Sequence, residues 1–317
     1  GISVHPMAIF KFNHNRFKLE DGHWMDADTN KFLHVLTRNV DAFPFVIVSA
    51  RRFQDDGTSF DFGLKEIREN KIDLSYLSKT GTKELVADIL KIDLEKIEES
   101  ENFGKTVDYI FEKTQGNPFF IEQVTLYLVE NNAIDEKFNI IEKHIEIPAD
   151  ISAIIIARID RLTMELKEIV KAASVLGREF AATILAAMLQ NDDIGKFLDE
   201  GEEETIWNAV SEINYLFRHA LIRETVYEMQ LKQKLRQLHK LAAETVESLY
   251  ANDLKPHYFE LANHYEKAEI VDKAIEYLEK AGDLAKENYQ NEEAIDFYDR
   301  LIAILEKEID EAEAAEK

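Results

Sequence analysis

The spacing of hydrophobic positions differs between the first 72 residues and the rest of the chain. Residues 8–12 and 17–19 are short alternating stretches that predict strands, and residues 43–50 form a continuous apolar, β-branched run. A run of this kind is typical of a strand buried on both faces of a parallel sheet. Between these stretches, four apolar side chains recur at helical spacing: Phe32, Leu33, Leu36 and Val40. Residues 1–72 therefore predict a small α/β layer.

From residue 73 to residue 146 the apolar positions follow a helical period, interrupted by Gly116-Asn117-Pro118. Glycine suits the position that ends a helix, asparagine caps the next helix, and proline fits its first turn. We therefore expect a new helix over residues 119–131.

Residues 147–230 predict a helical bundle with a short strand. Helical spacing covers residues 151–162, 165–176, 181–189 and 206–213. The acidic segment 199–204 predicts a loop, and Trp207 is expected in the core. Residues 215–218 predict a strand that leads into a helix from His219. Several helices followed by a short strand suit a winged-helix bundle.

Residues 231–317 are helical by periodicity and contain a repeat. Small and large side chains alternate at the spacing of a tetratricopeptide repeat: Leu261, Ala262, Tyr265, Ala274, Leu278 and Ala281. The segment 294–297 repeats the pattern of 274–277. Residues 306–317 are charged and rich in alanine, and we expect them to fray.

Composition restricts the partners of the chain. It has 317 residues, 45% of them hydrophobic, which is enough for several packed cores and argues against a disordered protein. Its 62 acidic and 38 basic residues give a net charge of −24, which disfavours nucleic acid and anionic membranes. There are no cysteines, and no apolar run approaches the roughly 20 residues that span a bilayer. We expect a cytoplasmic protein with protein or small-molecule partners.

One stretch is locally basic and raises the question of DNA binding. It contains Arg218, Arg223, Lys232, Lys234, Arg236, His239 and Lys240. Residues 232, 236 and 240 would share one face of a helix. The overall acidity opposes nucleic-acid binding, so we do not expect it.

Five segments, in this order, resemble motifs of AAA-type signalling ATPases of the STAND class, the kind attached to class III nucleotide cyclases and protein kinases. They resemble the end of a Walker B strand, the next core strand, a lid motif, and the entry and close of a winged helix: residues 19–26, 45–51, 116–120, 147–180 and 217–224. The resemblance covers residues 17–305. It implies a mainly α fold with an N-terminal α/β remnant.

The resemblance also implies a division into four parts. These are a partial P-loop NTPase sheet (1–72), a helical lid (73–146), a winged-helix-like domain (147–230) and tetratricopeptide-like helical repeats (231–317).

Two features depart from that family. No G-x-x-x-x-G-K-[ST] is present, and the nearest segment, 79–83, lacks both the first glycine and the terminal Gly-Lys pair of the loop that cradles phosphate. Residues 13–16 and Lys18 are polar where the family's Walker B strand is apolar. Either the P-loop lies in an upstream segment outside these residues, which we favour, or the chain is a non-catalytic relative. In both cases we do not expect this chain to act as an ATPase, or to bind a cofactor, by itself.

The resemblance implies roles for the residues of the first part if a nucleotide site is completed. Glu20 would hold Mg²⁺ through water, and Asp21 would orient the attacking water. Ser49 would sense the γ-phosphate, and Arg51 or Arg52 would pair with it. Otherwise these are polar groups at strand ends and at a helix N-terminus, where carboxylates are favoured anyway.

Two later residues are implied to contact the nucleotide. Pro118 would pack near the adenine of ATP or ADP, although Asn-Pro after glycine is also ordinary helix punctuation. His219 would touch the β-phosphate of ADP, although a lone histidine between apolar residues is more often a core histidine. His14, His23 and His34 lack the spacing of metal ligands.

Two functions remain open on this basis. The first is a regulatory nucleotide switch, in which ADP holds the parts together, and ATP or a ligand of the repeats releases them. The repeats would bind protein partners, and an attached cyclase or kinase would be the effector. The alternative is a non-catalytic scaffold with a decayed ATPase domain.

Overall fold

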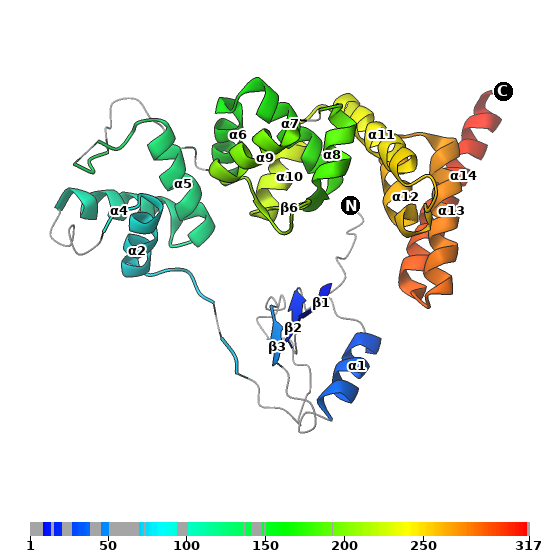
Figure 1. The fold of residues 1–317 in the computed structure, drawn as a ribbon, viewed down its shortest axis with the longest axis horizontal. Coiled ribbons are helices and arrows are strands. Elements are labelled where there is room, and N and C mark those ends of the chain that lie inside the picture. Colours follow the sequence, from blue (N-terminus) through cyan, green and yellow to red (C-terminus); the bar gives the residue numbers. More distant parts are fainter. Residues whose placement is uncertain are drawn as a thin grey trace. The chain divides into compact units, whose positions relative to one another are not determined.

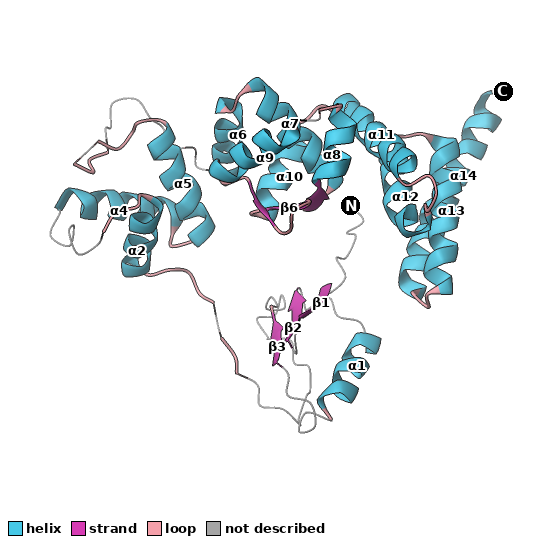
Figure 2. Cartoon of the chain, viewed as in Figure 1, coloured by secondary structure: helices cyan, strands magenta, loops and turns pink. Residues whose placement is uncertain are grey.

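The computed structural model describes most of the chain and is mainly helical, as the periodicity predicts (Figures 1 and 2). It describes residues 9–13, 16–20, 27–38, 46–50, 70–72, 74–93, 101–135, 137–140, 148, 150–191 and 193–315. The chain divides into two compact units, Gly1–Ser75 and Tyr76–Lys317. None of the described helices is both long enough and apolar enough to cross a membrane.

The first unit contains a mixed sheet of order β1-β2-β3. Its elements are β1 (Ile9–Asn13), β2 (Arg16–Glu20), α1 (Ala27–Thr37) and β3 (Val46–Ser49). β2 and β3 are parallel, with Phe17 opposite Ile47, whereas β1 runs antiparallel to β2. Among the described strands, the expected partial parallel sheet is therefore represented by the β2–β3 pair.

The strand β3 corrects the expectation that residues 43–50 are buried on both faces. Val46 and Val48 are 57% and 58% exposed, and Ile47 and Ser49 are partly buried. Alternate side chains of a strand point to opposite faces, so one face of β3 is open among the described residues. A β-branched run predicts a strand well, but it does not fix how many of its faces are covered.

The second unit begins with three packed helices: α2 (Lys79–Ile89), α4 (Glu101–Thr114) and α5 (Pro118–Glu130). Their core contains Val86, Phe103, Val107, Ile110, Ile121, Val124 and Leu128. The predicted punctuation is confirmed: Pro118 opens α5, and the Asn117 side chain accepts a hydrogen bond from the Phe120 N–H. Gly116 has φ +81°, and an added Cβ would lie 2.2 Å from the Leu77 carbonyl oxygen. Only glycine fits this backbone.

A bundle with a small antiparallel sheet follows. Its helices are α6 (Ile151–Arg161), α7 (Met164–Leu176), α8 (Ala182–Leu189), α9 (Ile194–Glu203) and α10 (Ala220–Glu228). The strands β4 (Glu179–Ala181), β6 (Asn214–Phe217) and β5 (Trp207–Ala209) pair in the order β4-β6-β5. The core includes Phe180, Trp207 and Phe217, whose rings are in contact.

Two local predictions in this bundle are wrong. Residues 199–204, expected as a loop, belong to α9 through Glu203, and residues 207–209, expected as helix, form β5. The buried Trp207 explains the second error, because its indole N–H donates to the Leu198 carbonyl oxygen 2.8 Å away. This contact holds Trp207 against α9. Residues 207–209 therefore cannot continue in the direction of that helix. The acidic residues of α9 lie beside buried Leu198 and Gly201, so the helix is amphipathic.

The remainder is a series of helices (Figure 1). They are α11 (Lys232–Leu249), the 3₁₀ turn η2 (Lys255–His257), α12 (Tyr258–Lys267), α13 (Val271–Glu287) and α14 (Asn291–Ala315). The repeat positions named from the sequence are all buried: Leu261, Ala262, Tyr265, Ala274, Leu278 and Ala281. Ala294 and Phe297 of the second segment are buried as well. The expected fraying is not seen, because α14 is helical through Ala315.

Candidate functional site

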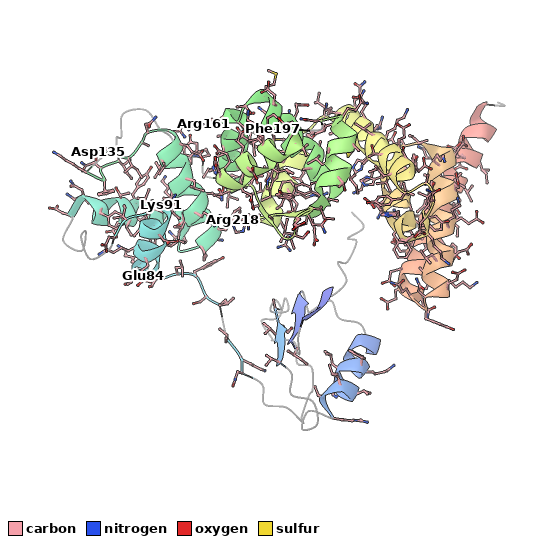
Figure 3. All side chains as sticks on the ribbon, viewed as in Figure 1. Glu84, Lys91, Asp135, Arg161, Phe197 and Arg218 are labelled. Carbon is pink, nitrogen blue, oxygen red and sulfur yellow. The ribbon has the colours of Figure 1, made fainter. Side chains whose placement is uncertain are left out.

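The N-terminal turn of α5 meets the residues that connect β6 to α10. The Phe119 ring lies 4.1 Å from the His219 ring, centroid to centroid, at an interplanar angle of 39°. His219 directly precedes α10, and Arg218, labelled in Figure 3, directly follows β6. Two sequence motifs about 100 residues apart therefore form one site.

Glu122 is the centre of this site. Its two carboxylate oxygens lie 2.8 Å from Nη2 of Arg218 and 3.0 Å from Nε2 of His219. The Glu122 side chain is 12% exposed, whereas those of Arg218 and His219 are 39% and 34% exposed. Burial by itself raises the pKa of Glu122, but the hydrogen bond with His219 and the charges of Arg218, His219 and Arg158 outweigh it and hold the pKa below its usual value. The site therefore contains a carboxylate that neighbouring cations keep ionised.

Local structure positions these side chains. Pro118 begins α5, so both Phe119 and Glu122 are helical. They are three residues apart and therefore lie on the same side of the helix. On the other side, Phe217 is fully buried and its N–H donates to the Arg178 carbonyl oxygen. The next N–H, of Arg218, donates to the Ile206 carbonyl oxygen. The backbone is thus fixed at the point where Arg218 and His219 leave the sheet.

A second contact ties α5 to the bundle through Arg158 of α6. Its guanidinium donates to Glu130 Oε1 at 2.8 Å and to Gln123 Oε1 at 2.6 Å, both on α5. It also donates to the Glu204 carbonyl oxygen and the Thr205 hydroxyl, which follow α9. The guanidinium borders a small pocket that is otherwise mostly apolar, with Ile155, Ile159 and Ile222 in its lining. Arg158 is satisfied by protein groups, so we regard it as structural.

The nucleotide-contact residues expected in the second unit lie at this site. Pro118 is exposed at the first position of α5, next to the partly buried Phe119. His219 is partly exposed and hydrogen-bonded to Glu122, and it is not enclosed by apolar side chains. Sequence reasoning missed Glu122 as a functional residue. One feature of the sequence could have indicated it. Glu122 is an acidic residue in the first turns of α5, between apolar residues such as Ile121 and Val124 that are buried.

The structure describes only some of the nucleotide-contact residues expected in the first unit. Glu20 is the last residue of β2 and Ser49 the last of β3, whereas Asp21 and Arg51 lie outside the described residues. The Ser49 hydroxyl oxygen is buried and has no hydrogen-bond partner among the described residues. A completed nucleotide site would bring Glu20 together with Pro118 and His219, and this arrangement stays a prediction.

The side chains near the start of α10 partly fit the ATP or ADP that the resemblance implies. Arg218, His219 and the N-terminus of α10 together suit an anion, because they offer charged donors and free helix amides. The Glu122 carboxylate already contacts both the Arg218 guanidinium and the His219 ring. No three His, Asp or Glu side chains in the described part of the chain gather as metal ligands, so a Mg²⁺ site there depends on the prediction for Glu20.

Most of the basic stretch is paired with acidic residues. Lys234 contacts Glu168, Arg236 contacts Glu269, and Lys240 contacts Glu244. Arg223 is partly buried and donates to the Ser174 carbonyl oxygen, and His239 is fully buried. The positive charge of this stretch is therefore largely balanced within the protein itself.

Comparison with known proteins gives one distant similarity to report. No protein-family model matches the chain. The chain is 24% identical over 284 residues to an uncharacterized protein of Rhizobium meliloti (strain 1021). The match covers 83% of this chain and 25% of that protein, so the chain spans about a quarter of the length of the curated relative it matches.

Proposed function

We propose that this chain is a regulatory nucleotide-switch and protein-interaction module of a STAND-class signalling ATPase, without ATPase activity of its own. In this proposal α2, α4 and α5 form the lid, α6 to α10 with β4 to β6 form the winged helix, and α11 to α14 are tetratricopeptide-like repeats. The first unit is the remaining part of the P-loop sheet. The P-loop itself is placed in a segment outside these 317 residues, and the module is cytoplasmic.

The observation that supports the proposal is the contact of Phe119 and Glu122 with Arg218 and His219. Phe119 belongs to the lid motif, and Arg218 and His219 belong to the winged-helix motif, which the resemblance associates with adenine and phosphate. A nucleotide phosphate would bind Arg218 and His219 by charge-assisted hydrogen bonds, in competition with Glu122. Pro118 and Phe119 would lie toward the base.

Competition between Glu122 and a phosphate would couple nucleotide binding to the position of the lid. A ligand shifts such an equilibrium only by its difference in affinity for the two arrangements. ADP would favour one arrangement, and ATP or a partner on the repeats would favour the other. Glu20, Asp21, Ser49 and Arg51 keep their proposed roles toward Mg²⁺, water and the γ-phosphate in the completed site.

The test is nucleotide-dependent thermal stability of this chain extended upstream by a P-loop segment. MgADP should raise the melting temperature of the extended protein, and His219→Ala should reduce that shift. Glu168→Gln, which removes a carboxylate from a surface ion pair, is the matched control and should leave the shift unchanged. An extended protein whose melting temperature does not respond to MgADP or MgATP would contradict the proposal.

A non-catalytic scaffold is the second candidate, and one observation favours it. A decayed site is expected to fill its phosphate position with the protein's own charged side chains, and Glu122 does this for Arg218 and His219. Glu122→Gln distinguishes the two candidates in the extended protein. A switch should bind MgADP more tightly once the competing carboxylate is gone, whereas a scaffold should not bind MgADP in either form.

A further inference from the structure

The helix α14 carries an exposed apolar strip next to the side that bears its buried residues. Ile295, Ile302, Leu305 and Ile309 are each between 40% and 58% exposed. On the same helix, Ala294 and Phe297 are buried against the other repeat helices. The strip therefore lies beside the core-facing side of α14 and stays exposed where that side is buried.

The strip has the spacing of a helix-pairing surface. Ile295, Ile302 and Ile309 are seven residues apart, and Tyr298 and Leu305 follow the first two after three residues. This is the a and d pattern of a heptad repeat, in which apolar side chains of one helix pack between those of another. α14 thus presents the seam that a second amphipathic helix requires.

Acidic side chains border the strip on both sides. Along α14, exposed Asp299 and Glu306 each follow an isoleucine of the strip by four residues, and Asp310 continues the row. On the α13 side, the Tyr298 hydroxyl donates to Asp283 at 2.7 Å. Glu279, one turn earlier, is exposed like Asp283, and Lys286, one turn later, is the basic residue of this row.

We propose that this α13–α14 surface binds an amphipathic α-helix of a protein partner whose apolar face is bordered by lysine and arginine. Apolar anchors at heptad spacing would fill the strip, and basic side chains would meet the acidic rows on either side. The net charge of −24 would also speed the approach of a basic segment. The proposal rests on the partner-binding role of the repeats and not on nucleotide binding.

A second copy of this chain is a poorer occupant. In an antiparallel pair of α14 helices, the positions of Asp299 and Glu306 would face the same positions of the other copy. Like charges at these positions disfavour pairing. In a parallel pair, Asp299 and Glu306 of one copy would face positions such as Leu301 of the other copy. Leu301 already packs into the repeat core of its own chain and offers no partner for a carboxylate.

The first experiment measures binding of a designed helical peptide to the full chain by fluorescence anisotropy. The probe has leucine at the a and d positions and lysine at the flanking positions, and the comparison peptide has glutamate in place of lysine. We expect the lysine peptide to bind and the glutamate peptide to bind at least about tenfold more weakly. Equal binding of the two peptides would overturn the proposal.

Variants of the chain locate the binding surface. The double variant Ile302→Asp/Leu305→Asp should weaken binding of the lysine peptide by about tenfold or more, since it places charge in the centre of the strip. Met164→Asp, at an even more exposed apolar residue of α7, is the control and should bind like the parent chain. Circular dichroism melts check that the variants are folded. An unchanged affinity of the folded double variant would contradict the proposed location.

Charge reversal tests the acidic row separately. Asp299→Lys/Glu306→Lys should weaken binding of the lysine peptide and strengthen binding of the glutamate peptide. Sedimentation velocity of the parent chain tests the competing occupant. A dimer that the Ile302→Asp/Leu305→Asp variant converts to a monomer would overturn the proposal in favour of self-association. None of these measurements involves nucleotide, so a failed nucleotide switch and a failed docking surface give different results.

Discussion

The Nδ1 atoms of His239 and His264 lie 2.8 Å apart in the buried contact between α11 and α12. The Tyr227 hydroxyl lies 2.9 Å from Nε2 of His239, so three side chains from α10, α11 and α12 form a chain of hydrogen bonds. Burial, with the positive charge of neighbouring groups, lowers the pKa of His239 to about 3 and that of His264 to about 4. Both rings are neutral at pH 7. Tyr227 then donates to His239, and His239 donates to His264.

This pair predicts a loss of stability in mild acid. Both histidines have a pKa near 6.5 in the unfolded chain and a lower pKa in the folded chain. Below pH 6.5 the unfolded chain therefore binds protons that the folded chain does not, and the free energy of unfolding falls as the pH decreases toward 4. The fall approaches about 1.4 kcal/mol per pH unit for each histidine. Urea unfolding between pH 7 and pH 5 measures it, and His264→Gln should reduce the slope. The same slope in both proteins would argue against this assignment.

Two glycines of α9 predict opposite effects of the same substitution. A Cβ on Gly201 would lie 2.2 Å from the Trp207 ring, whereas a Cβ on Gly195 would have no atom within 4 Å. Gly201→Ala should destabilise the protein by about 1–3 kcal/mol, because the buried indole must move. Gly195→Ala should stabilise it by up to about 1 kcal/mol through helix propensity. Thermal or chemical unfolding of the two variants measures both effects, and a neutral Gly201→Ala would show that Trp207 packs elsewhere.

Removal of Arg158 is predicted to be costly. Its side chain is only 10% exposed and satisfies groups on α5 and in the segment after α9. Arg158→Met keeps much of the volume but leaves Glu130 and the buried amide of Gln123 without their partner, which should cost about 3–5 kcal/mol. Lys167→Met, in a more exposed ion pair with Asp160, is the control and should cost no more than about 1 kcal/mol. Similar melting temperatures for both variants would contradict the structural role given to Arg158.

The Glu122 site predicts a pH dependence that is separate from that of the histidine pair. Since the folded pKa of Glu122 is lowered, its contribution to stability is present above the unfolded pKa near 4.5 and is lost as the pH falls through the folded value. Glu122→Gln should therefore lower the free energy of unfolding at pH 7 by about 1–3 kcal/mol and have less effect at pH 3. Chemical unfolding at the two pH values gives the comparison. An equal loss at both would mean that packing, and not charge, holds Glu122.

The sequence predicted elements best where local chemistry and packing agree. Gly116-Asn117-Pro118 defines a helix boundary by itself, and the alanines of the repeats mark where helices approach closely, so both predictions are confirmed. The prediction failed around residues 199–209, because a distant contact decides the structure there. The burial of Trp207 against Leu198 and Gly201 is not visible in a local pattern of acidic and apolar residues.

The candidate site was predictable only in part for the same reason. Pro118 and His219 could be named from motifs, but their connection depends on how α5 packs on the bundle. Glu122 has no motif of its own, and only the folded chain places its carboxylate between Arg218 and His219. A single sequence shows which residues have suitable chemistry, and the tertiary contacts determine which of them act together.

The two attachments of α5 differ in a way that sets how this helix could move. Near its start, Glu122 contacts the partly exposed side chains of Arg218 and His219, which the proposed phosphate would also bind. From Gln123 to Glu130, the helix is held by the nearly buried Arg158. Displacement of Glu122 would therefore release only the first turn, and α5 would pivot about Arg158 rather than separate from the bundle. A small tilt at that pivot would be carried to α2 and α4, which pack against the same helix.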